Sequence, residues 1–305
     1  MNTVTDTPVA TSPLSLLRAA IEALRPKQWT KNTLLFAALF FSLSFKDGHQ
    51  WGKALMGFAA FCMLSSSGYI FNDARDRFAD VHHPKKKKRP IASGRLPVTL
   101  AYVEIGVIFA IGCALAWLTN PWFLAVALLY FATTISYSLY FKHFVILDVM
   151  FLASGFIWRA AAGAVAIDVV ISPWLLTCTA FFALFLGFNK RRGELTLMEG
   201  QSAESRKALK QYTQALVIEF QAITTSSAII SYALYTVLAS PTPWLIVTLP
   251  HVLYAVFRYI YLVSVEGDGG APDETLLRDR PMLLTCLLYG VTLIVVLLVA
   301  PLRPH

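Results

Sequence analysis

Residues 69–97 read YIFNDARDRFADVHHPKKKKRPIASGRLP and place carboxylates and a run of lysines directly after an apolar segment. The preceding residues, 52–68, contain a single charged side chain, that of Lys53. A helix needs about 20 mostly apolar residues to cross a bilayer core. The stretch therefore predicts a spanning helix that ends at a membrane surface where charge is concentrated.

The composition of the whole chain supports this interpretation. Of the 305 residues, 56% are hydrophobic and only 14% are charged, with a formal net charge of +8. Soluble domains carry about a quarter charged residues. The sequence therefore predicts an all-α, polytopic integral membrane protein rather than an ordinary soluble domain.

Apolar runs of spanning length predict nine transmembrane helices. Prolines stand at or just before several of the expected starts, where the missing N–H costs little. We expect a disordered tail over 1–15 and a single domain over 16–305, with an interfacial helix at about 16–25. The expected spans are 30–46, 52–73, 98–118, 121–141, 145–166, 172–189, 216–238, 243–264 and 282–302.

Lysine and arginine are distributed unevenly between the two sides that these spans define. Cytoplasmic loops hold the excess of basic residues, and the loops after the second and sixth expected spans carry KKKKR and KRR. The opposite side has only Lys46, Lys53 and Arg303. We therefore expect the amino terminus on the cytoplasmic side and the carboxyl terminus outside.

The carboxylates of the opening stretch have a helical spacing. Asn72, Asp76 and Asp80 are four residues apart, so they drift by about 40° per step and share one face, whereas Asp73 and Arg75 are expected to point elsewhere. Oxygen ligands on one face suit Mg²⁺, which keeps waters and bridges carboxylates to substrate phosphates. The alternative is a solvated helix end with scattered charge.

The adjoining basic run, HHPKKKKRP, has two explanations. It can anchor the chain to anionic head groups, or it can bind a phosphate beside the metal. Nucleic acid is disfavoured as a partner because the run lacks interleaved aromatic residues and is confined to a short loop. Pro90 and Gly94 would give such a loop a defined course.

Several motifs resemble those of one family. NDARDRFAD, residues 72–80, is similar to the NDxxDxxxD motif of the UbiA superfamily of intramembrane prenyltransferases. RPKQWTKN at 25–32, DVHHPKKKKRPIASG at 80–94, KRRGEL at 190–195 and GGAPDETLLRDRP at 269–281 resemble the decaprenyl-phosphate phosphoribosyltransferase branch. The resemblance implies nine helices around a central cavity open to the cytoplasm, in a bacterial inner membrane.

The resemblance also implies a reaction. Members of the branch transfer 5-phosphoribose from phosphoribosyl diphosphate to a polyprenyl phosphate and release diphosphate, with Mg²⁺ as cofactor. Asn72, Asp76 and Asp80 would be the catalytic metal and diphosphate ligands. The lipid phosphate is already an anion, so alignment should matter more than a general base. An alternative is transfer of a prenyl group from its diphosphate to an aromatic acceptor, and a transporter or lipid-binding scaffold is a third reading.

Further residues are expected to bind the sugar 5-phosphate, the ribose or the lipid phosphate. In the alternative interpretation, some of the basic residues bind no substrate and only follow the excess of positive charge in cytoplasmic loops. The expected set is Lys31, Lys85, Lys88, Arg89, Tyr137, Lys142, Asp148, Lys190, Arg191 and Glu194. Asp148 could bind a metal, ribose hydroxyls or Lys142, or could pin two helices together.

The loop after the sixth expected span departs from the wider superfamily. A second aspartate-rich motif is usual there, but this chain has KRRGEL with Glu194 and, further on, Glu199. Basic residues in place of acidic ones suit a donor substrate that carries one more phosphate group than a prenyl diphosphate does. The sequence does not decide the acceptor length or whether the chain is a monomer or a homo-oligomer.

Two other charged sites lead to expectations about pairing. Arg159 lies deep in an expected span, where an ionisable group needs a partner, so we expect a buried carboxylate or helix carbonyls beside it. The acidic segment before the last span is expected to fold over the site as a lid, with Asp279 paired to Arg258.

Overall fold

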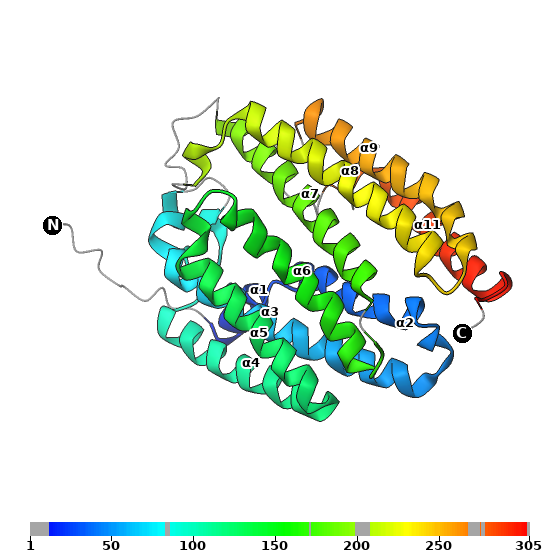
Figure 1. Cartoon of the computed structure of the whole chain (residues 1–305). Coiled ribbons are helices and arrows are strands. Elements are labelled where there is room, and N and C mark those ends of the chain that lie inside the picture. Colours follow the sequence, from blue (N-terminus) through cyan, green and yellow to red (C-terminus); the bar gives the residue numbers. More distant parts are fainter. Residues whose placement is uncertain are drawn as a thin grey trace.

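The computed structural model describes residues 12–303 apart from 83–85, 171, 199–207, 268–274 and 276–277, and the side chains of 197 and 198 also lie outside the described part. Every regular element in this part of the chain is helical (Figure 1). The elements are α1 Pro13–Ala23, η1 Pro26–Phe36, α2 Ala37–Phe41, η2 Ser44–Lys46, α3 Gly48–His82, η3 Lys86–Lys88, α4 Val98–Thr119, α5 Pro121–Leu139, η4 Phe141–His143, α6 Leu147–Ala166, α7 Pro173–Met198, η5 Leu209–Gln211, α8 Gln214–Leu238, η6 Pro243–Thr248, α9 Leu249–Ser264 and α11 Arg280–Val299.

Within the described residues, 7 helical segments are long and apolar enough to cross a membrane. They are α3, α4, α5, α6, α8, η6 with α9, and α11. The expected spans 172–189 and 30–46 are not among them. Helix α7 covers the former with 26 residues, enough for about 39 Å, but its last turns carry the KRRGE charges.

The segment expected to form one span at 30–46 is not a single regular helix. It consists of the 3₁₀ helix η1, the short helix α2 and the 3₁₀ turn η2. Arg25 before η1 and Leu43 before η2 have φ values of 53° and 61°, in the left-handed region. The polar run TKNT within η1 explains the break, because these side chains need partners that a lipid-facing helix does not offer.

The amino-terminal helix begins earlier than expected. Pro13 is its first residue, and the Ser12 hydroxyl caps it by accepting from the Ser15 N–H at 3.3 Å. Residues 13–15, assigned to the tail from sequence, are therefore the first helical turn. Leu14, Leu17 and Ile21 are exposed on α1. Such an apolar face is typical of an interfacial helix, and that location stays a prediction.

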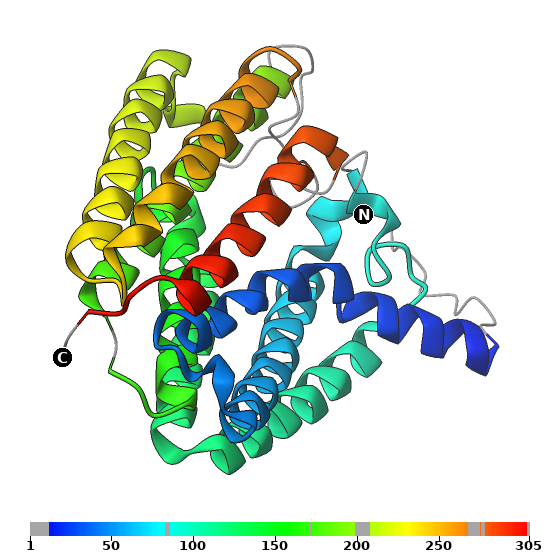
Figure 2. The ribbon, with the colours of Figure 1, turned by 90° about the vertical axis from the view of Figure 1, so that its right-hand side faces the viewer.

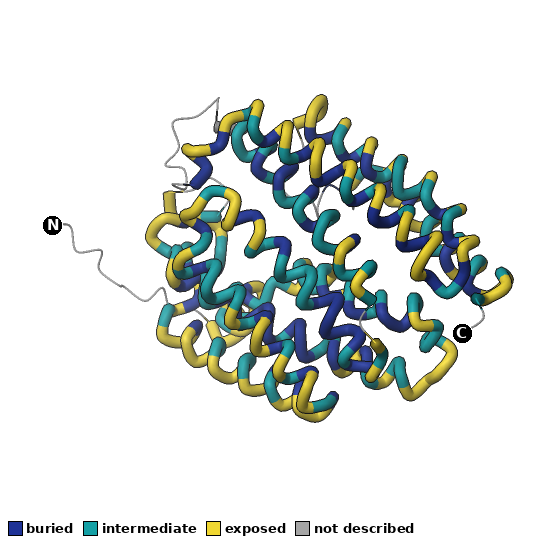
Figure 3. Tube along the Cα trace, viewed as in Figure 1, coloured by how far each residue is buried: buried dark blue, intermediate teal, exposed yellow. Residues whose placement is uncertain are grey.

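Most of the helices pack against their neighbours along the chain, and the long helix α3 contacts α4, α5, α6 and η1. Helix α3 lies against α4, α5 against α6, α6 against both η1 and α7, and α7 against α8, while α9 packs with α11 (Figure 2). Exposed apolar residues, including Val103, Val107 and Ile111, run along the outer side of α4 (Figure 3). In a bilayer this side would face lipid.

Small residues allow α6 and η1 to approach closely. A Cβ atom on Gly163 of α6 would lie 2.2 Å from the Leu35 carbonyl oxygen of η1. Ala160, Ala162 and Ala164 on the same helix are buried. Close backbone contact of this kind requires residues without bulky side chains.

Gly163→Ala should destabilise the protein by about 1–3 kcal/mol, because the added methyl group would overlap a backbone oxygen that cannot move without displacing η1. Gly106→Ala on α4 is the matched control, since a Cβ there meets nothing within 4 Å. The control should be neutral or stabilising by up to about 1 kcal/mol. Thermal unfolding of both variants in detergent tests this, and equal melting temperatures would contradict the contact.

Candidate functional site

The charged residues expected at the cytoplasmic surface gather at one end of the helix bundle. The carboxyl-terminal turns of α3 reach this end, together with the loop that precedes α4 and the turn between α5 and α6 (Figure 1). Two clusters of side chains form here. One surrounds the carboxylates of α3, and the other joins α6 to α7.

The first cluster is built on two buried carboxylates. Asp73 and Asp80 are both 3% exposed. Arg89 Nη1 lies 2.9 Å from Asp73 Oδ1 and 2.5 Å from Asp80 Oδ2, so one guanidinium bridges both groups. Arg25 Nη2 contacts the two oxygens of Asp73 at 2.5 and 2.7 Å. The charge of the carboxylates is thus balanced by arginines from two separate loops.

Asp76 has its own cation. Lys142 Nζ from η4 lies 2.7 and 3.0 Å from the two Asp76 oxygens. Lys142 is 7% exposed and comes from the turn between α5 and α6. Asn72 is half-buried, and its side chain forms no hydrogen bond with other described residues. The α3 cluster therefore consists of Arg25, Asn72, Asp73, Asp76, Asp80, Arg89 and Lys142.

Asp73 was expected to point away from this group, and that expectation is wrong. At about 100° per residue, Asp73 and Asp80 differ by seven residues, which is about 20° short of two full turns. They therefore share a face more closely than Asn72 and Asp80, which differ by about 80°. The i, i+7 spacing in the sequence was the signal that identifies Asp73. Arg75 does lie elsewhere, with Nη2 donating to the Leu139 carbonyl at 3.2 Å.

The loop after α3 has the defined course that its proline and glycine predict. Gly94 has a φ of 74°, and the Leu96 N–H donates to the Pro90 carbonyl at 3.0 Å. Arg95 then contacts both Glu22 oxygens of α1 at 2.6 and 2.9 Å, and this hydrogen bonding lowers the pKa of Glu22. The loop is thereby fixed to α1 and presents Arg89 to α3.

The structure describes only part of the lysine run at 85–88. Lys88 is exposed, and its carbonyl accepts a hydrogen bond from Arg95 at 2.6 Å. Lys85 lies outside the described residues. Arg89, which ends this basic run, lies against the α3 carboxylates.

The second cluster joins α6 to α7. Arg191 is only 1% exposed, and its Nε lies 2.8 Å from Asp148 Oδ2 without the alignment of a hydrogen bond. Arg191 Nη1 also binds Glu194. Arg191 Nη2 is buried and has no hydrogen-bond partner among the described residues. This α6–α7 cluster keeps one arginine donor available at the end of the bundle.

One alternative from the sequence paired Asp148 with Lys142. In the structure, Asp148 pairs with Arg191 instead. Its Oδ1 accepts from the Tyr212 hydroxyl at 2.8 Å, and that hydroxyl accepts from the Ile146 N–H at 2.7 Å. Burial raises the pKa of Tyr212, which keeps it a donor. Tyr212 was missed from sequence, because a tyrosine in a loop carries no spacing signal. Tyr137 of α5 lies near Arg191.

A cavity of about 650 Å³ extends from the polar end into the apolar body of the bundle. Lys31 of η1 and Lys190 of α7 line it together with Thr30 and Thr33. The rest of its wall is mainly apolar. These residues are Leu34, Phe36, Ala37, Phe40, Phe41, Leu152, Phe156, Ala183, Leu186, Gly187, Tyr289 and Leu293.

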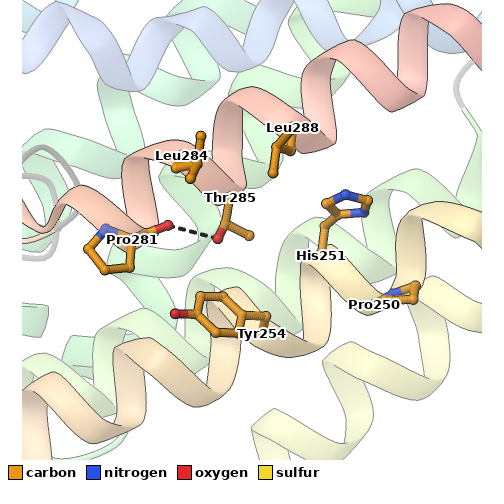
Figure 4. Close-up of a pocket in the computed structure, with 7 residues that line it drawn as sticks. All are labelled: Pro250, His251, Tyr254, Pro281, Leu284, Thr285 and Leu288. Atoms are coloured by element: carbon orange, nitrogen blue, oxygen red, sulfur yellow. Dashed lines mark hydrogen bonds between the residues drawn. The ribbon is translucent and has the colours of Figure 1, made fainter.

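A second, smaller groove lies between α9 and α11 (Figure 4). Its volume is about 310 Å³, and it is lined by Pro250, His251, Tyr254, Pro281, Leu284, Thr285 and Leu288. None of the residues expected to bind substrate or metal lines this groove. The larger cavity and the two charged clusters therefore hold the described residues that suit the expected chemistry.

The donor atoms of the α3 cluster are suited to Mg²⁺. Asn72, Asp76 and Asp80 offer hard oxygen ligands from one helix face. Within the described residues, no group of three acidic, histidine or cysteine side chains is close enough to enclose a metal. An ion held by these residues would take its remaining ligands from phosphate and water.

The pairing expected between Arg258 and Asp279 is confirmed. Arg258 Nη2 and Nε lie 2.7 and 3.2 Å from the carboxylate oxygens, and this contact lowers the pKa of Asp279. Asp279 also accepts from the Met282 N–H at 2.9 Å, as the N-cap of α11. Residues 268–274, the centre of the expected lid, lie outside the described residues.

Comparison with known proteins shows where this architecture belongs. The sequence model of the UbiA prenyltransferase family matches residues 33–277. The chain belongs to this UbiA family. It is 34% identical to the decaprenyl-phosphate phosphoribosyltransferase of Mycolicibacterium smegmatis, over 90% of each chain. It is also 32% identical to the protein of the same name from Mycobacterium tuberculosis, over 93% of this chain and 96% of that one.

Solved UbiA structures have the same fold. A UbiA homolog from Archaeoglobus fulgidus, bound to GPP and Mg²⁺, gives a TM-score of 0.71 at 18% identity, over 92% of this chain and 100% of that chain. A digeranylgeranylglyceryl phosphate synthase structure gives a TM-score of 0.63 at 16% identity, over 92% of this chain and 96% of that chain. The all-α membrane architecture is therefore that of the UbiA family.

Arg89→Met should lower the free energy of unfolding by about 3–5 kcal/mol, because it leaves Asp80 unpaired and Asp73 with Arg25 alone. Arg75→Met, which removes an exposed arginine bound only to a carbonyl, should cost less than about 1 kcal/mol. Thermal unfolding in detergent measures both. An equal effect of the two variants would argue against the bridging role of Arg89.

Proposed function

We propose that the protein transfers 5-phosphoribose from phosphoribosyl diphosphate to a polyprenyl phosphate in a Mg²⁺-dependent reaction. In this proposal the chain has nine spans in a bacterial inner membrane, the amino terminus is cytoplasmic, and the site opens to the cytoplasm. UbiA family membership and the all-helical membrane fold are the coarser features on which the proposal builds. The charge of the site and the similarity to relatives support the finer assignment.

The observation that carries the proposal is the buried arginine of the α6–α7 cluster. Arg191 is buried in the last turns of α7, its Nη2 has no hydrogen-bond partner among the described residues, and the neighbouring Lys190 lines the cavity. A guanidinium donor held in place by two carboxylates is suited to bind a phosphate oxygen. Phosphoribosyl diphosphate carries a 5-phosphate as well as a diphosphate, so it can engage both charged clusters at once.

The names of the relatives support the same choice. Proteins from Mycolicibacterium smegmatis and Corynebacterium glutamicum that are 34% and 35% identical to this chain are named decaprenyl-phosphate phosphoribosyltransferases. Both matches extend over at least 90% of this chain. A shared donor and acceptor would explain why the two clusters have this distribution of charge.

In the proposed reaction, Asn72, Asp76 and Asp80 would hold Mg²⁺. The ion would supply charge stabilisation to the diphosphate leaving group. Arg89 and Lys142 lie against the α3 carboxylates and keep positive charge close to the same phosphates. Asp73 would orient Arg25 and Arg89, since it contacts both guanidinium groups.

The larger cavity is proposed to bind the lipid acceptor. Lys31 and Lys190 at its polar end would pair with the lipid phosphate, and the apolar wall would bury the first isoprene units. Its volume of about 650 Å³ is within the range of ligand pockets. The remainder of a long tail would lie in the bilayer. Because the acceptor phosphate is ionised at neutral pH, alignment of the two substrates is the main task of the protein.

The proposal is tested by incubating the purified protein in detergent with Mg²⁺, decaprenyl phosphate and ribose-labelled phosphoribosyl diphosphate. Label should move into the organic phase, and EDTA should abolish the transfer. Asp76→Asn should reduce kcat/KM by at least about 100-fold, because it removes a metal ligand. Asp168→Asn is the control, because it breaks an ion pair with Lys53, at 2.6 Å, that lies far from the site. This variant should leave kcat/KM unchanged.

Two results would contradict the proposal in different ways. If prenyl diphosphate is consumed with an aromatic acceptor while ribose label stays in water, the metal site is retained but the substrates are wrong. If neither transfer occurs and Asp76→Asn leaves lipid binding unchanged, the protein acts as a lipid-binding scaffold or transporter.

Ala183→Phe should raise KM for decaprenyl phosphate by about tenfold or more and leave KM for the donor unchanged, because Ala183 lines the apolar part of the cavity. Ala110→Phe on the exposed side of α4 is the control and should change neither value. Steady-state kinetics with each substrate varied in turn tests this. A parallel rise in both KM values would place the donor, rather than the lipid, in this cavity.

A further inference from the structure

Arg159 is a buried cation in the middle of α6. It is 4% exposed, and all three of its nitrogen atoms form hydrogen bonds. Nε donates to Asn32 Oδ1 at 2.7 Å, Nη2 to the Tyr130 hydroxyl at 2.8 Å and Nη1 to the Gly155 carbonyl at 2.8 Å. The helix carbonyl expected from sequence is thus present.

The carboxylate that was the other expectation is not found among the described residues, where no ion pair of Arg159 is formed. The guanidinium instead packs on the Tyr130 ring, 4.7 Å from its centroid. Burying a charge that only neutral groups compensate is costly within a membrane protein. The hydrogen bonds of Arg159 must therefore compensate for this cost.

The segment held by these hydrogen bonds is η1. Asn32 is completely buried, and its amide donates in turn to Ser65 Oγ and Cys62 Sγ of α3, both at 3.3 Å. Asn32 therefore connects α6 and α3 through the segment between them. Arg159 supplies the shortest of these contacts.

The neighbours of Asn32 in the chain line the larger cavity. Lys31 and Thr33 both belong to its wall, so the orientation of Asn32 decides where these two side chains point. The 3₁₀ conformation of η1 extends over 11 residues, longer than the three or four residues usual for such helices. An element with weak internal hydrogen bonds depends on external contacts to keep its rotation about its own axis.

A second contact from α6 acts on the same segment. Gly163, four residues after Arg159, lies against the backbone of Leu35. Arg159 and Gly163 thus fix η1 at two points on one face of α6. Rotation of η1 by one residue would remove Lys31 from the cavity wall and break both contacts.

We propose that Arg159 is a positioning residue that, through Asn32, holds η1 in the rotation that directs Lys31 into the lipid cavity. The assignment rests on the proposed function only in that Lys31 there meets the phosphate of a polyprenyl phosphate. Arg159 acts by geometry, through a planar group with several fixed donors, and not by its charge alone.

The test measures Lys31 directly. The full-length protein in detergent is acetylated with an amine reagent, and modification of Lys31 is followed by peptide mass spectrometry as geranylgeranyl phosphate is added. In the wild-type protein the lipid phosphate should slow modification of Lys31. In Arg159→Met, the concentration that gives half-protection should rise about tenfold or more, as expected for loss of a hydrogen bond to a charged group.

Three further variants separate the explanations. Arg159→Lys keeps the charge but cannot form the three contacts, so it should resemble Arg159→Met. Asn32→Ala removes the other end of the contact and gives the same test if Arg159→Met does not fold. Trp158→Phe is the matched control, because it removes a 3.2 Å hydrogen bond from α6 to Thr133 of α5 that does not involve η1. It should leave protection unchanged.

The possible results are distinguishable. Unchanged protection in folded Arg159→Met or Asn32→Ala would overturn the proposal, as would full rescue by Arg159→Lys or the absence of protection in the wild-type protein. If the wild-type protein fails to transfer ribose but Lys31 is protected and Arg159→Met weakens protection, the proposed reaction fails and the positioning role stands.

Discussion

Two buried carboxylates on one helix depend on arginines that come from other parts of the chain. Asp73 and Asp80 of α3 are almost inaccessible to solvent, and Arg89 bridges them while Arg25 also binds Asp73. An unpaired charge at such a depth would be very costly. The loop after α3 and the segment before η1 must therefore both fold against the end of this helix, and the polar end of the protein is organised around that requirement.

The same need for partners explains the irregular first segment. A regular helix over 30–46 would turn Asn32 and its polar neighbours toward the apolar interior or the lipid without guaranteeing contacts. In the observed structure, Asn32 meets Arg159 of α6 and serine and cysteine side chains of α3. Backbone that is not α-helical is tolerated within a membrane where other parts of the protein bury it. The 3₁₀ helix η1 is covered in this way by α3 and α6.

In the proposed function, the two charged clusters recognise different phosphates. In the α3 cluster, the carboxylate oxygens pair with arginine and lysine side chains. The α6–α7 cluster centres on Arg191, which lies between Asp148 and Glu194. The cavity wall between η1 and α7 contributes Lys31 and Lys190. In the proposed function, these clusters would bind chemically distinct anionic groups, and the apolar cavity would receive the lipid chain.

The sequence by itself determined the all-helical membrane class and the positions of most helices, whereas the metal ligands that it suggests stay a prediction. Helices α4, α5, α6, α8 and α11 lie within a few residues of their expected ranges, because apolar length and proline at helix starts are local properties. The Arg258–Asp279 pair was also foreseen, since opposite charges at adjoining helix ends have few other partners. Only the tertiary structure decided that Asp73 belongs to the α3 cluster, that Asp148 pairs with Arg191 and that Tyr212 completes that pair. The Tyr212–Asp148 contact joins residues 64 positions apart, and the choice of partner for a buried charge depends on which helices pack together, not on spacing along one of them.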